Sequence, residues 1–152
     1  MMIRDYRPSD FEEIMAIYAQ SKLDELRFEP KKFELLPLEK DEKRLQSLLA
    51  SRIFVWEADG ITGYGAVCQN DIESLFVHPR HRGQGIGSTM FEYLLTEVDS
   101  PARLYVAKSN APAIALYRKY GFSVSREFET SYNGRAVMAN EMVRMSEAPD
   151  SQ

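Results

Sequence analysis

Hydrophobic residues recur along the chain with two different periods, and the change of period separates predicted helices from predicted strands. Four segments carry apolar residues three or four positions apart, which is the spacing of one helix face; they begin near residues 11, 38, 85 and 111. Short apolar runs bounded by turn residues lie around them, as is typical of strands. The order is strand, two helices, three strands, helix, strand, helix and a closing hairpin, which predicts an α+β fold.

The helical segments have recognisable starts and apolar faces. Ser9 or Asp10 can cap the first helix. In the second helix, Leu45, Leu48 and Leu49 are expected on the buried side. The four helices are expected at residues 11–18, 38–51, 85–98 and 111–120.

The strands are bounded by strong turn signals. Asp59-Gly60 and Asn133-Gly134 are two-residue hairpin turns. Gly63 and Gly65 weaken the strand that contains them, so we expect a bulge or a close backbone approach there. The strands are expected at residues 2–6, 53–58, 61–69, 72–78, 102–107, 122–132 and 135–145.

Length and composition place further limits on the protein. With 152 residues and no visible linker, residues 1–145 are expected to form one domain, followed by a C-terminal tail at 146–152. The net charge of −4 and the scattered basic residues argue against a nucleic-acid partner, and no apolar run is long enough for a membrane helix. Cys68 is the only cysteine and no signal peptide is visible, so a cytoplasmic location is expected. Two histidines and one cysteine are too few for a recognisable metal site.

The most informative stretch runs from residue 75 to residue 88. Its apolar run ends at Val77, and Pro79 stops the strand because it lacks a backbone N–H. Two arginines and three glycines follow within residues 80–87, and a helical pattern begins at Ile86. A helix that starts from a glycine-rich turn presents unpaired backbone N–H groups and the positive end of its dipole. We therefore expect this turn to bind the phosphates of a cofactor.

A second motif follows about twenty residues later. Residues 82–87 read Arg-Gly-Gln-Gly-Ile-Gly, and residues 109–122 read Ser-Asn-Ala-Pro-Ala-Ile-Ala-Leu-Tyr-Arg-Lys-Tyr-Gly-Phe. Together they resemble the two signatures of the GNAT family of N-acetyltransferases, Arg/Gln-x-x-Gly-x-Gly/Ala and Asn-x-x-Ala-x-x-Leu-Tyr-x-x-x-Gly-Phe. The resemblance implies a GNAT-like fold: a central mixed, mostly antiparallel sheet of six to seven strands with about four helices on its two faces.

The resemblance also implies acetyl-CoA, or a close acyl-CoA, as donor, and the scarcity of histidine and cysteine predicts no metal. The amides of the glycine turn would bind the pyrophosphate, with Arg82 either adding charge or pointing outward. The strand before the turn would pair with the pantetheine arm, in a gap that the family makes by splaying two neighbouring strands. Asn110 would bind the cofactor near its amides, or cap the helix that follows. The implied cofactor-binding residues are Leu75, Phe76, Val77, Arg82, Gly83, Gln84, Gly85, Ile86, Gly87, Ser88 and Asn110.

The chemistry is attack of a neutral amine on a thioester, which needs a base, an oxyanion donor and an acid for the leaving thiolate. Tyr117 stands where many family members place the acid, although a tyrosine at this helical spacing can equally be a core residue. Some relatives carry a glutamate base where this chain has Tyr105. Glu73 is the better candidate here, because strand alternation puts it on the same face as Leu75 and Val77.

Three alternatives to these roles stay open at this point. Glu73 can instead be an exposed or salt-bridged strand residue, and the base can be water or Glu141 on the last strand. The oxyanion donor can be a backbone N–H of the central strand, with that of Val77 as the first choice.

These expectations describe an N-acetyltransferase that moves an acetyl group from acetyl-CoA to a primary amine by direct attack in a ternary complex. The alternative is a non-catalytic acyl-CoA-binding regulatory module with the same fold. The acceptor is expected to be the amine of a small molecule or peptide, with neither nucleic acid nor membrane as partner, and the resemblance also admits a homodimer. Acceptor specificity is expected in the partly helical stretch 21–37 and in the turn at residues 133–134.

Overall fold

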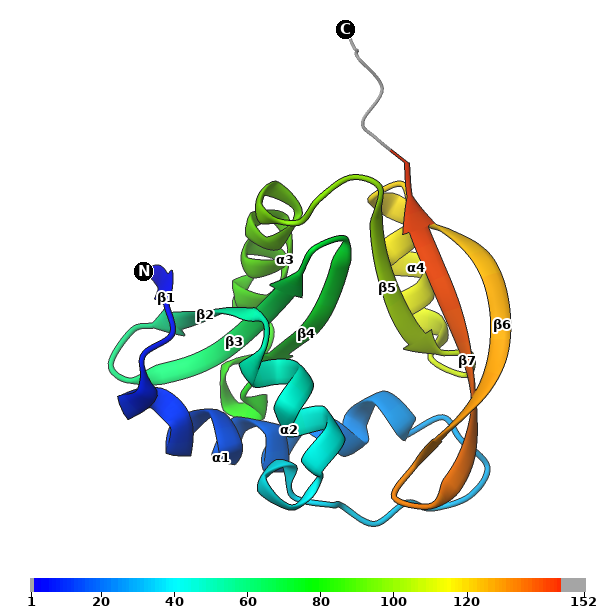
Figure 1. Ribbon diagram of the computed structural model, residues 1–152, viewed down its shortest axis with the longest axis horizontal. Helices are drawn as coiled ribbons and strands as arrows, with labels where there is room; N and C mark the ends of the chain where they lie inside the picture. The colour runs from blue at the N-terminus through cyan, green and yellow to red at the C-terminus, as the bar shows by residue number, and fades with distance from the viewer. Residues whose placement is uncertain (1, 146–152) are drawn as a thin grey trace, which may run out of the picture.

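The computed structural model describes residues 2–145, and Figure 1 shows their arrangement. Short 3-10 turns, η1 to η4, connect several of the elements. They lie at Pro8–Asp10, Lys22–Leu26, Leu38–Lys40 and Pro79–His81. The helices are α1 (Phe11–Ser21), α2 (Glu42–Leu49), α3 (Ile86–Glu97) and α4 (Ala111–Lys119). The strands are β1 (Ile3–Asp5), β2 (Arg52–Glu57), β3 (Ile61–Cys68), β4 (Asp71–Val77), β5 (Ala102–Ala107), β6 (Ser123–Tyr132) and β7 (Arg135–Arg144).

The seven strands form one sheet in the order β1-β2-β3-β4-β5-β7-β6. All neighbouring pairs are antiparallel except β4 and β5, which are parallel. The expected α+β fold, with a mixed and mostly antiparallel sheet and four α-helices, is therefore confirmed. The expected tail at residues 146–152 lies outside the described residues.

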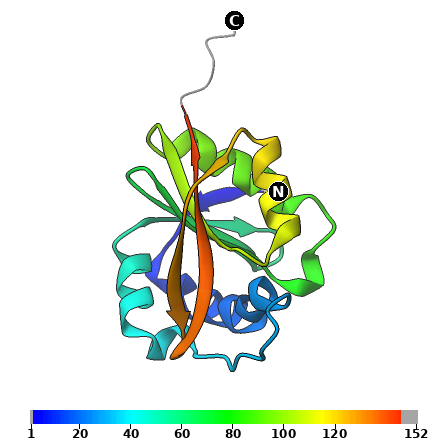
Figure 2. The same cartoon turned by 90° about the vertical axis from the view of Figure 1, so that its right-hand side faces the viewer.

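The helices cover the two faces of the sheet in pairs (Figure 1 and Figure 2). Alternate residues of β2 show the division, because successive side chains of a strand point to opposite faces. Val55 packs in a cluster with Ile14 of α1 and Leu48 of α2. Phe54 packs in another cluster, which contains Leu94 of α3 and touches α4. The sheet is thus enclosed between α1 with α2 and α3 with α4.

The two glycines of β3 let α3 approach the sheet closely. A Cβ atom at Gly65 would lie 2.7 Å from Leu94 Cδ1 and 3.3 Å from the Ser74 carbonyl oxygen. A Cβ atom at Gly63 would lie 3.2 Å from the Phe76 carbonyl oxygen. The predicted close approach is confirmed, and the β3–β4 register also shifts at Ala66, which marks a bulge.

The second helix is shorter than the sequence pattern predicts. Leu38–Lys40 is a separate 3-10 turn, because the backbone at Asp41, with φ −101° and ψ 85°, leaves the helical region before α2 begins. Leu48 is buried as expected, whereas Leu49 is 50% exposed, so the prediction for Leu49 is wrong. Consecutive helix residues are rotated by about 100°, and a helix of this length presents only a narrow stripe to the core.

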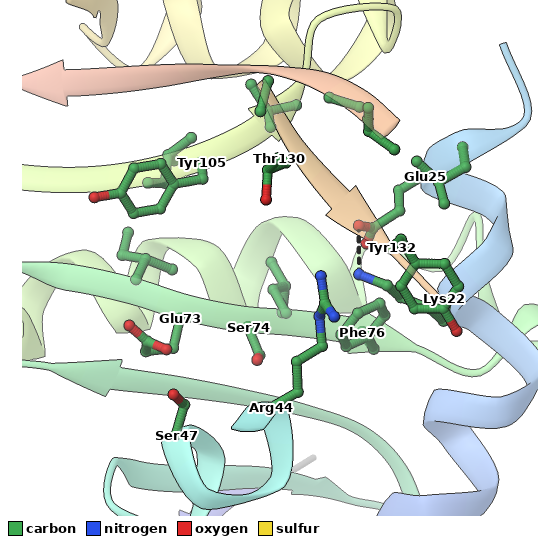
Figure 3. A pocket seen from close by; sticks show the side chains of 18 of the residues that line it. Lys22, Glu25, Arg44, Ser47, Glu73, Ser74, Phe76, Tyr105, Thr130 and Tyr132 are labelled. Carbon is green, nitrogen blue, oxygen red and sulfur yellow. Dashed lines mark hydrogen bonds and ion pairs between the residues drawn. The ribbon is translucent and has the colours of Figure 1, made fainter. Parts of the chain in front are cut away.

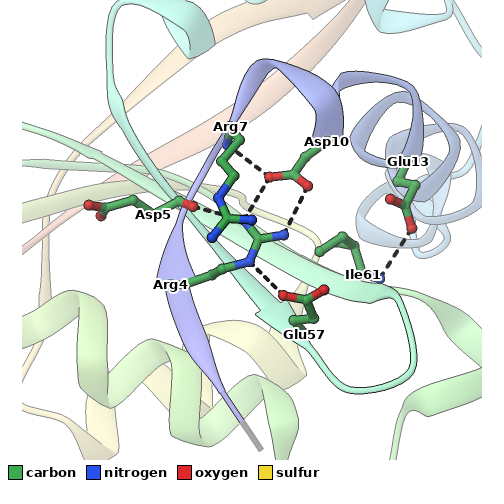
Figure 4. Close-up of polar contacts among 7 residues, drawn as sticks. All are labelled: Arg4, Asp5, Arg7, Asp10, Glu13, Glu57 and Ile61. Atoms are coloured by element: carbon green, nitrogen blue, oxygen red, sulfur yellow. Dashed lines mark hydrogen bonds and ion pairs between the residues drawn. The ribbon is translucent and has the colours of Figure 1, made fainter.

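A partly buried ion-pair cluster ties β1 to the start of α1 (Figure 4). Arg4 donates from both Nη atoms to Asp10, over 2.9 and 3.0 Å, and from Nε to Glu57 over 2.6 Å. These bonds to Arg4 are the main cause of the lowered pKa of Asp10. Asp10 is the N-cap residue of α1, but its carboxylate makes no bond to that helix and accepts from Arg4 and the Arg7 amide instead.

No helix within residues 2–145 is both long and apolar enough to cross a membrane.

Candidate active site

Strand β4 has one paired edge and one open edge. On one side it pairs with β3 from Cys68↔Asp71 to Gly63↔Val77. On the other side, among the described residues, its only register pair with β5 is Asp71↔Arg103, beside which Arg103 Nε donates to Asp71 Oδ1 over 2.6 Å. Beyond that point the two strands diverge, as Figure 1 shows. The splayed pair that the resemblance implied is therefore present.

The backbone of β4 offers polar groups to the open edge. The His78 amide donates to the Thr62 carbonyl of β3 over 2.8 Å, so the Val77 carbonyl of the same peptide group points away from β3. Because alternate residues of a strand turn their polar groups to the same edge, Leu75 also faces the gap. Phe76 turns its carbonyl toward Gly63 of β3. Leu75 and Val77 are thus the residues with backbone groups available at the gap.

The divergence opens a cavity of about 550 Å³ between β4 and β5. Glu73, Leu75, Phe76 and Tyr117 are the predicted site residues that line it. Figure 3 shows Glu73 and Ser74 on β4 facing the cavity, with Tyr105 of β5 across from them. The far end is lined by side chains from η2, α2 and the β6–β7 hairpin, which include Lys22, Glu25, Leu26, Arg44, Thr130 and Tyr132.

The glycine turn has the geometry of an anion site. Gly83 and Gly85 have φ angles of 79° and 81°, which an L side chain rarely adopts, and a Cβ atom at either would meet nothing within 4 Å. Gly85 is the N-cap of α3, so the amides that follow it lack partners in the preceding turn. Gln84 and Ser88 are exposed, whereas the Ile86 side chain is buried in the core and only its backbone can serve a ligand. The open turn fits a phosphate group.

Arg82 lies across the open edge of β4 instead of pointing into the glycine turn. Its Nε donates to the Val77 carbonyl over 3.2 Å, and its Nη1 forms a short ion pair with Asp24 of η2. Ser21 Oγ donates to the same carbonyl over 3.3 Å. Two side chains therefore donate hydrogen bonds to the Val77 carbonyl, which a pantetheine arm would approach.

Asn110 is 7% exposed and is the N-cap residue of α4. Its backbone carbonyl accepts from the Ile114 amide over 3.1 Å, but its side chain makes no capping bond. The side-chain amide of Asn110 therefore lies buried at the start of α4 without capping that helix. Neither Asn110 nor the glycine turn lines the cavity itself.

Tyr117 reaches the cavity from α4. Its ring packs against Phe91 and Phe122, with centroids 5.4 and 6.2 Å away. Burial raises the pKa of its hydroxyl to about 12, with a smaller contribution from Glu25. The hydroxyl therefore stays protonated near neutral pH and can donate a hydrogen bond.

Glu73 sits on a β-bulge. Ala66 pairs with Ser74 and Val67 pairs with Ile72, so Glu73 is the extra residue of β4. The bulge breaks the alternation from which we predicted that Glu73 shares a face with Leu75 and Val77. Those two residues pack toward α3, whereas Glu73 stands near Ser47 of α2 in Figure 3.

The surroundings of Glu73 raise its pKa, whereas those of Glu141, the other candidate base, lower it. Burial raises its pKa, the charge of Asp71 raises it further, and Arg103 opposes both. Glu141 differs, because a hydrogen bond from Ser125 is the main cause of its lowered pKa, with Arg126 adding to it. A carboxylate with a raised pKa is a stronger base, so it accepts a proton more readily near neutral pH.

Sequence reasoning missed the residues at the far end of the cavity. The stretch 21–37, where we expected acceptor specificity, contributes Lys22, Glu25 and Leu26 to the lining, but its aromatic residues Phe28 and Phe33 and the turn at residues 133–134 do not line the cavity. Arg44 and Tyr18 come from α2 and α1, where nothing in the periodicity distinguishes a cavity residue from a surface or core residue. Among residues 2–145, no three His, Cys, Asp or Glu side chains are placed to bind a metal ion together.

Comparison with known proteins agrees with this geometry. Residues 50–124 match the family model described as an acetyltransferase (GNAT) domain. The chain is 32% identical over 76 residues to the spermine/spermidine N(1)-acetyltransferase of Bacillus subtilis, which covers 47% of this chain and 49% of that protein. It is 30% identical over 83 residues to the peptidyl-lysine N-acetyltransferase YjaB of Salmonella typhimurium, covering 55% and 57%. The matched region thus spans about half the length of these curated relatives.

The fold is shared over a longer range. A structure of yncA from Salmonella typhimurium with acetyl-CoA superposes with a TM-score of 0.69, covering 100% of this chain and 99% of that chain at 23% identity. The matched domain contains the open edge of β4 and the glycine turn, and both signature motifs have the expected local structure. The chain therefore belongs to the GNAT acetyltransferase family.

Proposed function

We propose that the protein is an N-acetyltransferase that transfers the acetyl group of acetyl-CoA to a primary amine of a small molecule or peptide, by direct attack in a ternary complex. The observation that carries this proposal is the open edge of β4, which borders the cavity at one end and leads into the glycine turn at the other. An unpaired strand edge can hydrogen-bond to an extended amide chain, and a helix start can bind a phosphate.

The donor would lie along β4. Leu75 and Val77 would bond to the amides of the pantetheine arm, while the amides from Gly83 to Ser88 would hold the pyrophosphate. Arg82 would leave the Val77 carbonyl when the donor binds, and its charge would then be free for a phosphate. The buried side-chain amide of Asn110, which makes no capping bond, would hydrogen-bond to the donor from the other side of the gap.

The reaction requires that one C–N bond forms and one C–S bond breaks. The amine nitrogen attacks the thioester carbonyl carbon, and the thiolate of CoA leaves as the amide forms. One proton leaves the nitrogen and one reaches the sulfur, so the reaction needs no oxidant or metal to balance. The Val77 N–H at the open edge would stabilise the oxyanion.

Tyr117 and Glu73 are the proposed acid and base. The raised pKa of Tyr117 keeps its hydroxyl protonated and reduces the driving force for complete proton transfer, so its first contribution is a hydrogen bond to the developing thiolate. The raised pKa of Glu73 makes its carboxylate a better proton acceptor, directly or through water.

The relatives act on amines of different kinds: spermine and spermidine in one case and peptidyl-lysine in the other, as their names state. We propose that this chain shares an amine acceptor of this general type. A cytoplasmic location and a homodimer also stay predictions.

The decisive experiment measures thiol release from acetyl-CoA over a panel of primary amines, with acetyl-CoA affinity measured in parallel by calorimetry. Turnover with at least one amine supports the transferase. Tight binding of acetyl-CoA without release on any acceptor would instead identify the non-catalytic acyl-CoA-binding module.

A further inference from the structure

Two cationic side chains, Lys22 and Arg44, line the cavity on the side away from Glu73. Lys22 Nζ and the Arg44 guanidinium lie 5.2 and 5.1 Å from the centre of the same Tyr132 ring. Lys22 is paired with Glu25 over 2.7 Å. Figure 3 shows the Arg44 side chain reaching from α2 into the cavity beside this pair.

Arg44 is held in place without being saturated. Its Nη1 donates to Asp41 over 3.0 Å, its Nη2 donates to the Ser131 carbonyl over 3.3 Å, and its plane lies by the Tyr132 ring. Tyr132 is fixed in turn, because its hydroxyl accepts from the Leu36 amide over 2.7 Å. A guanidinium has five N–H groups, and these contacts leave several of them for a ligand. A fixed planar fork of this kind matches a carboxylate.

A second observation also points to a ligand. The Tyr18 hydroxyl is buried and has no hydrogen-bond partner within the described part of the chain, although the residue lines the same cavity. A buried hydroxyl without a partner destabilises a protein, so such groups are uncommon unless something binds them. Burial, with Tyr132 next in importance, raises the pKa of this hydroxyl, which keeps it a donor.

We infer that the acceptor amine also carries a carboxylate, which Arg44 binds with help from the Tyr18 hydroxyl after a small shift of the side chains around that hydroxyl. This inference rests on the proposed acetyl transfer. The acceptor would lie along the cavity with its amine near Glu73 and its carboxylate near Arg44. The volume of about 550 Å³, shared with the pantetheine arm, suits a small amino acid better than a folded protein segment.

The same charges disfavour a polyamine. A second ammonium group at this end would meet Arg44 and Lys22, and the two carboxylates there, Glu25 and Asp41, are already paired with them. Like charges at short range in a partly desolvated site raise the free energy of the complex. The acceptor preference would therefore differ from that of a spermine or spermidine enzyme.

The test compares three probe series of matched chain length: linear ω-amino acids from glycine to longer homologues, n-alkylamines and α,ω-diamines. Thiol release is measured at equal concentrations of neutral amine. We expect the best amino acid to exceed the matched alkylamine about tenfold in kcat/KM, because a hydrogen-bonded charge pair contributes about that much. Diamines should be the poorest acceptors.

Arg44→Gln identifies the carboxylate partner. We expect it to raise KM for the amino acid about tenfold more than for the alkylamine. Lys43→Gln is the matched control, because Lys43 is the exposed neighbour on the same helix and does not line the cavity. Tyr18→Phe should raise KM for the amino acid about fivefold, without lowering the stability of the free protein, since it removes a buried hydroxyl that has no partner.

Two results would overturn the inference while leaving the transferase intact: diamines or alkylamines as the preferred acceptors, or an equal loss with all acceptors in Arg44→Gln. If no amine is acetylated, the proposed function fails, and calorimetry of the ω-amino acids with the CoA-loaded protein then decides. Binding that Arg44→Gln abolishes would support the carboxylate site, and absence of binding would contradict it.

Discussion

The two edges of β4 show how one strand serves both stability and function. The edge toward β3 is paired along the strand and is supported by α3, which packs so closely that Gly65 has no room for a side chain. The edge toward β5 is joined at the Asp71↔Arg103 pair and then opens. Unpaired backbone groups are costly when buried, so a strand edge left open in the middle of a sheet indicates a site for a ligand.

The difference also explains where the polar side chains gather. Residues on the paired side form an apolar core around Phe54, Val67 and Leu94. The open side collects Glu73, Arg44 and Tyr105 around a cavity. Substitutions on the paired side should therefore change stability, whereas substitutions on the open side should change binding and turnover.

The largest effect should come from Tyr117→Phe at the open side. This change keeps the packing on Phe91 and removes only the hydroxyl, so we expect kcat for acetyl transfer to fall about 100-fold, a typical contribution of an acid. Steady-state thiol release measures it. Tyr120→Phe is the matched control, because the Tyr120 ring also packs against Phe91, while its hydroxyl donates to Glu92 over 2.9 Å and does not line the cavity. Unchanged turnover in Tyr117→Phe would rule out the acid role.

On the paired side, Gly65→Ala should reduce the free energy of unfolding by about 2 kcal/mol, because its Cβ atom would overlap Leu94 and force the contact between α3 and β3 apart. Urea denaturation followed by circular dichroism measures the loss. Gly63→Ala should cost less, since the nearest contacts there are longer, at 3.2 and 3.3 Å. Equal stability of Gly65→Ala and the unmodified protein would show that α3 can move away without cost.

The elements that depend on local sequence were predictable. Alternation and turn residues gave both hairpins, and Asp59 and Asn133 have the positive φ angles, 54° and 50°, that such turns require. The glycine turn and the start of α4 were also visible as motifs. The family signatures added what periodicity lacks, namely that β4 and β5 would separate.

The remainder depends on contacts between distant segments. The bulge at Glu73 inserts one residue into β4. The apolar pattern of β4 does not locate it, because apolar residues such as Ile72 and Leu75 occur at both even and odd positions of the strand. Arg44 acquires its place only when α2 packs beside Tyr132, which is far away in the sequence. Leu49 was predicted to be a core residue because Leu45, Leu48 and Leu49 have the i, i+3, i+4 spacing of one helix face.

A smaller effect is expected in the glycine turn, which follows the C-terminal end of β4. Gly85→Ala should weaken acetyl-CoA binding about tenfold, since its Cβ would stand where a phosphate approaches the start of α3. Calorimetry measures the affinity. Gly134→Ala is the matched control: its φ of 80° equals that of Gly85 within a degree, and its Cβ also meets nothing within 4 Å. If both variants bind acetyl-CoA alike, backbone strain and not contact with the donor explains the result.

The smallest effect concerns the point where the two strands still meet. Asp71→Asn removes a partly exposed ion pair with Arg103, so the free energy of unfolding should fall by less than about 1 kcal/mol.

The change has a second consequence, because the charge of Asp71 raises the pKa of Glu73 and Arg103 lowers it. Losing the former and freeing the latter both lower that pKa. In the proposed mechanism Glu73 acts as a carboxylate, so the acid limb of the kcat profile should move to lower pH, and a weaker base should lower the plateau. Glu73→Gln should remove that limb altogether, while a profile that neither variant changes would assign the base to water or to another group.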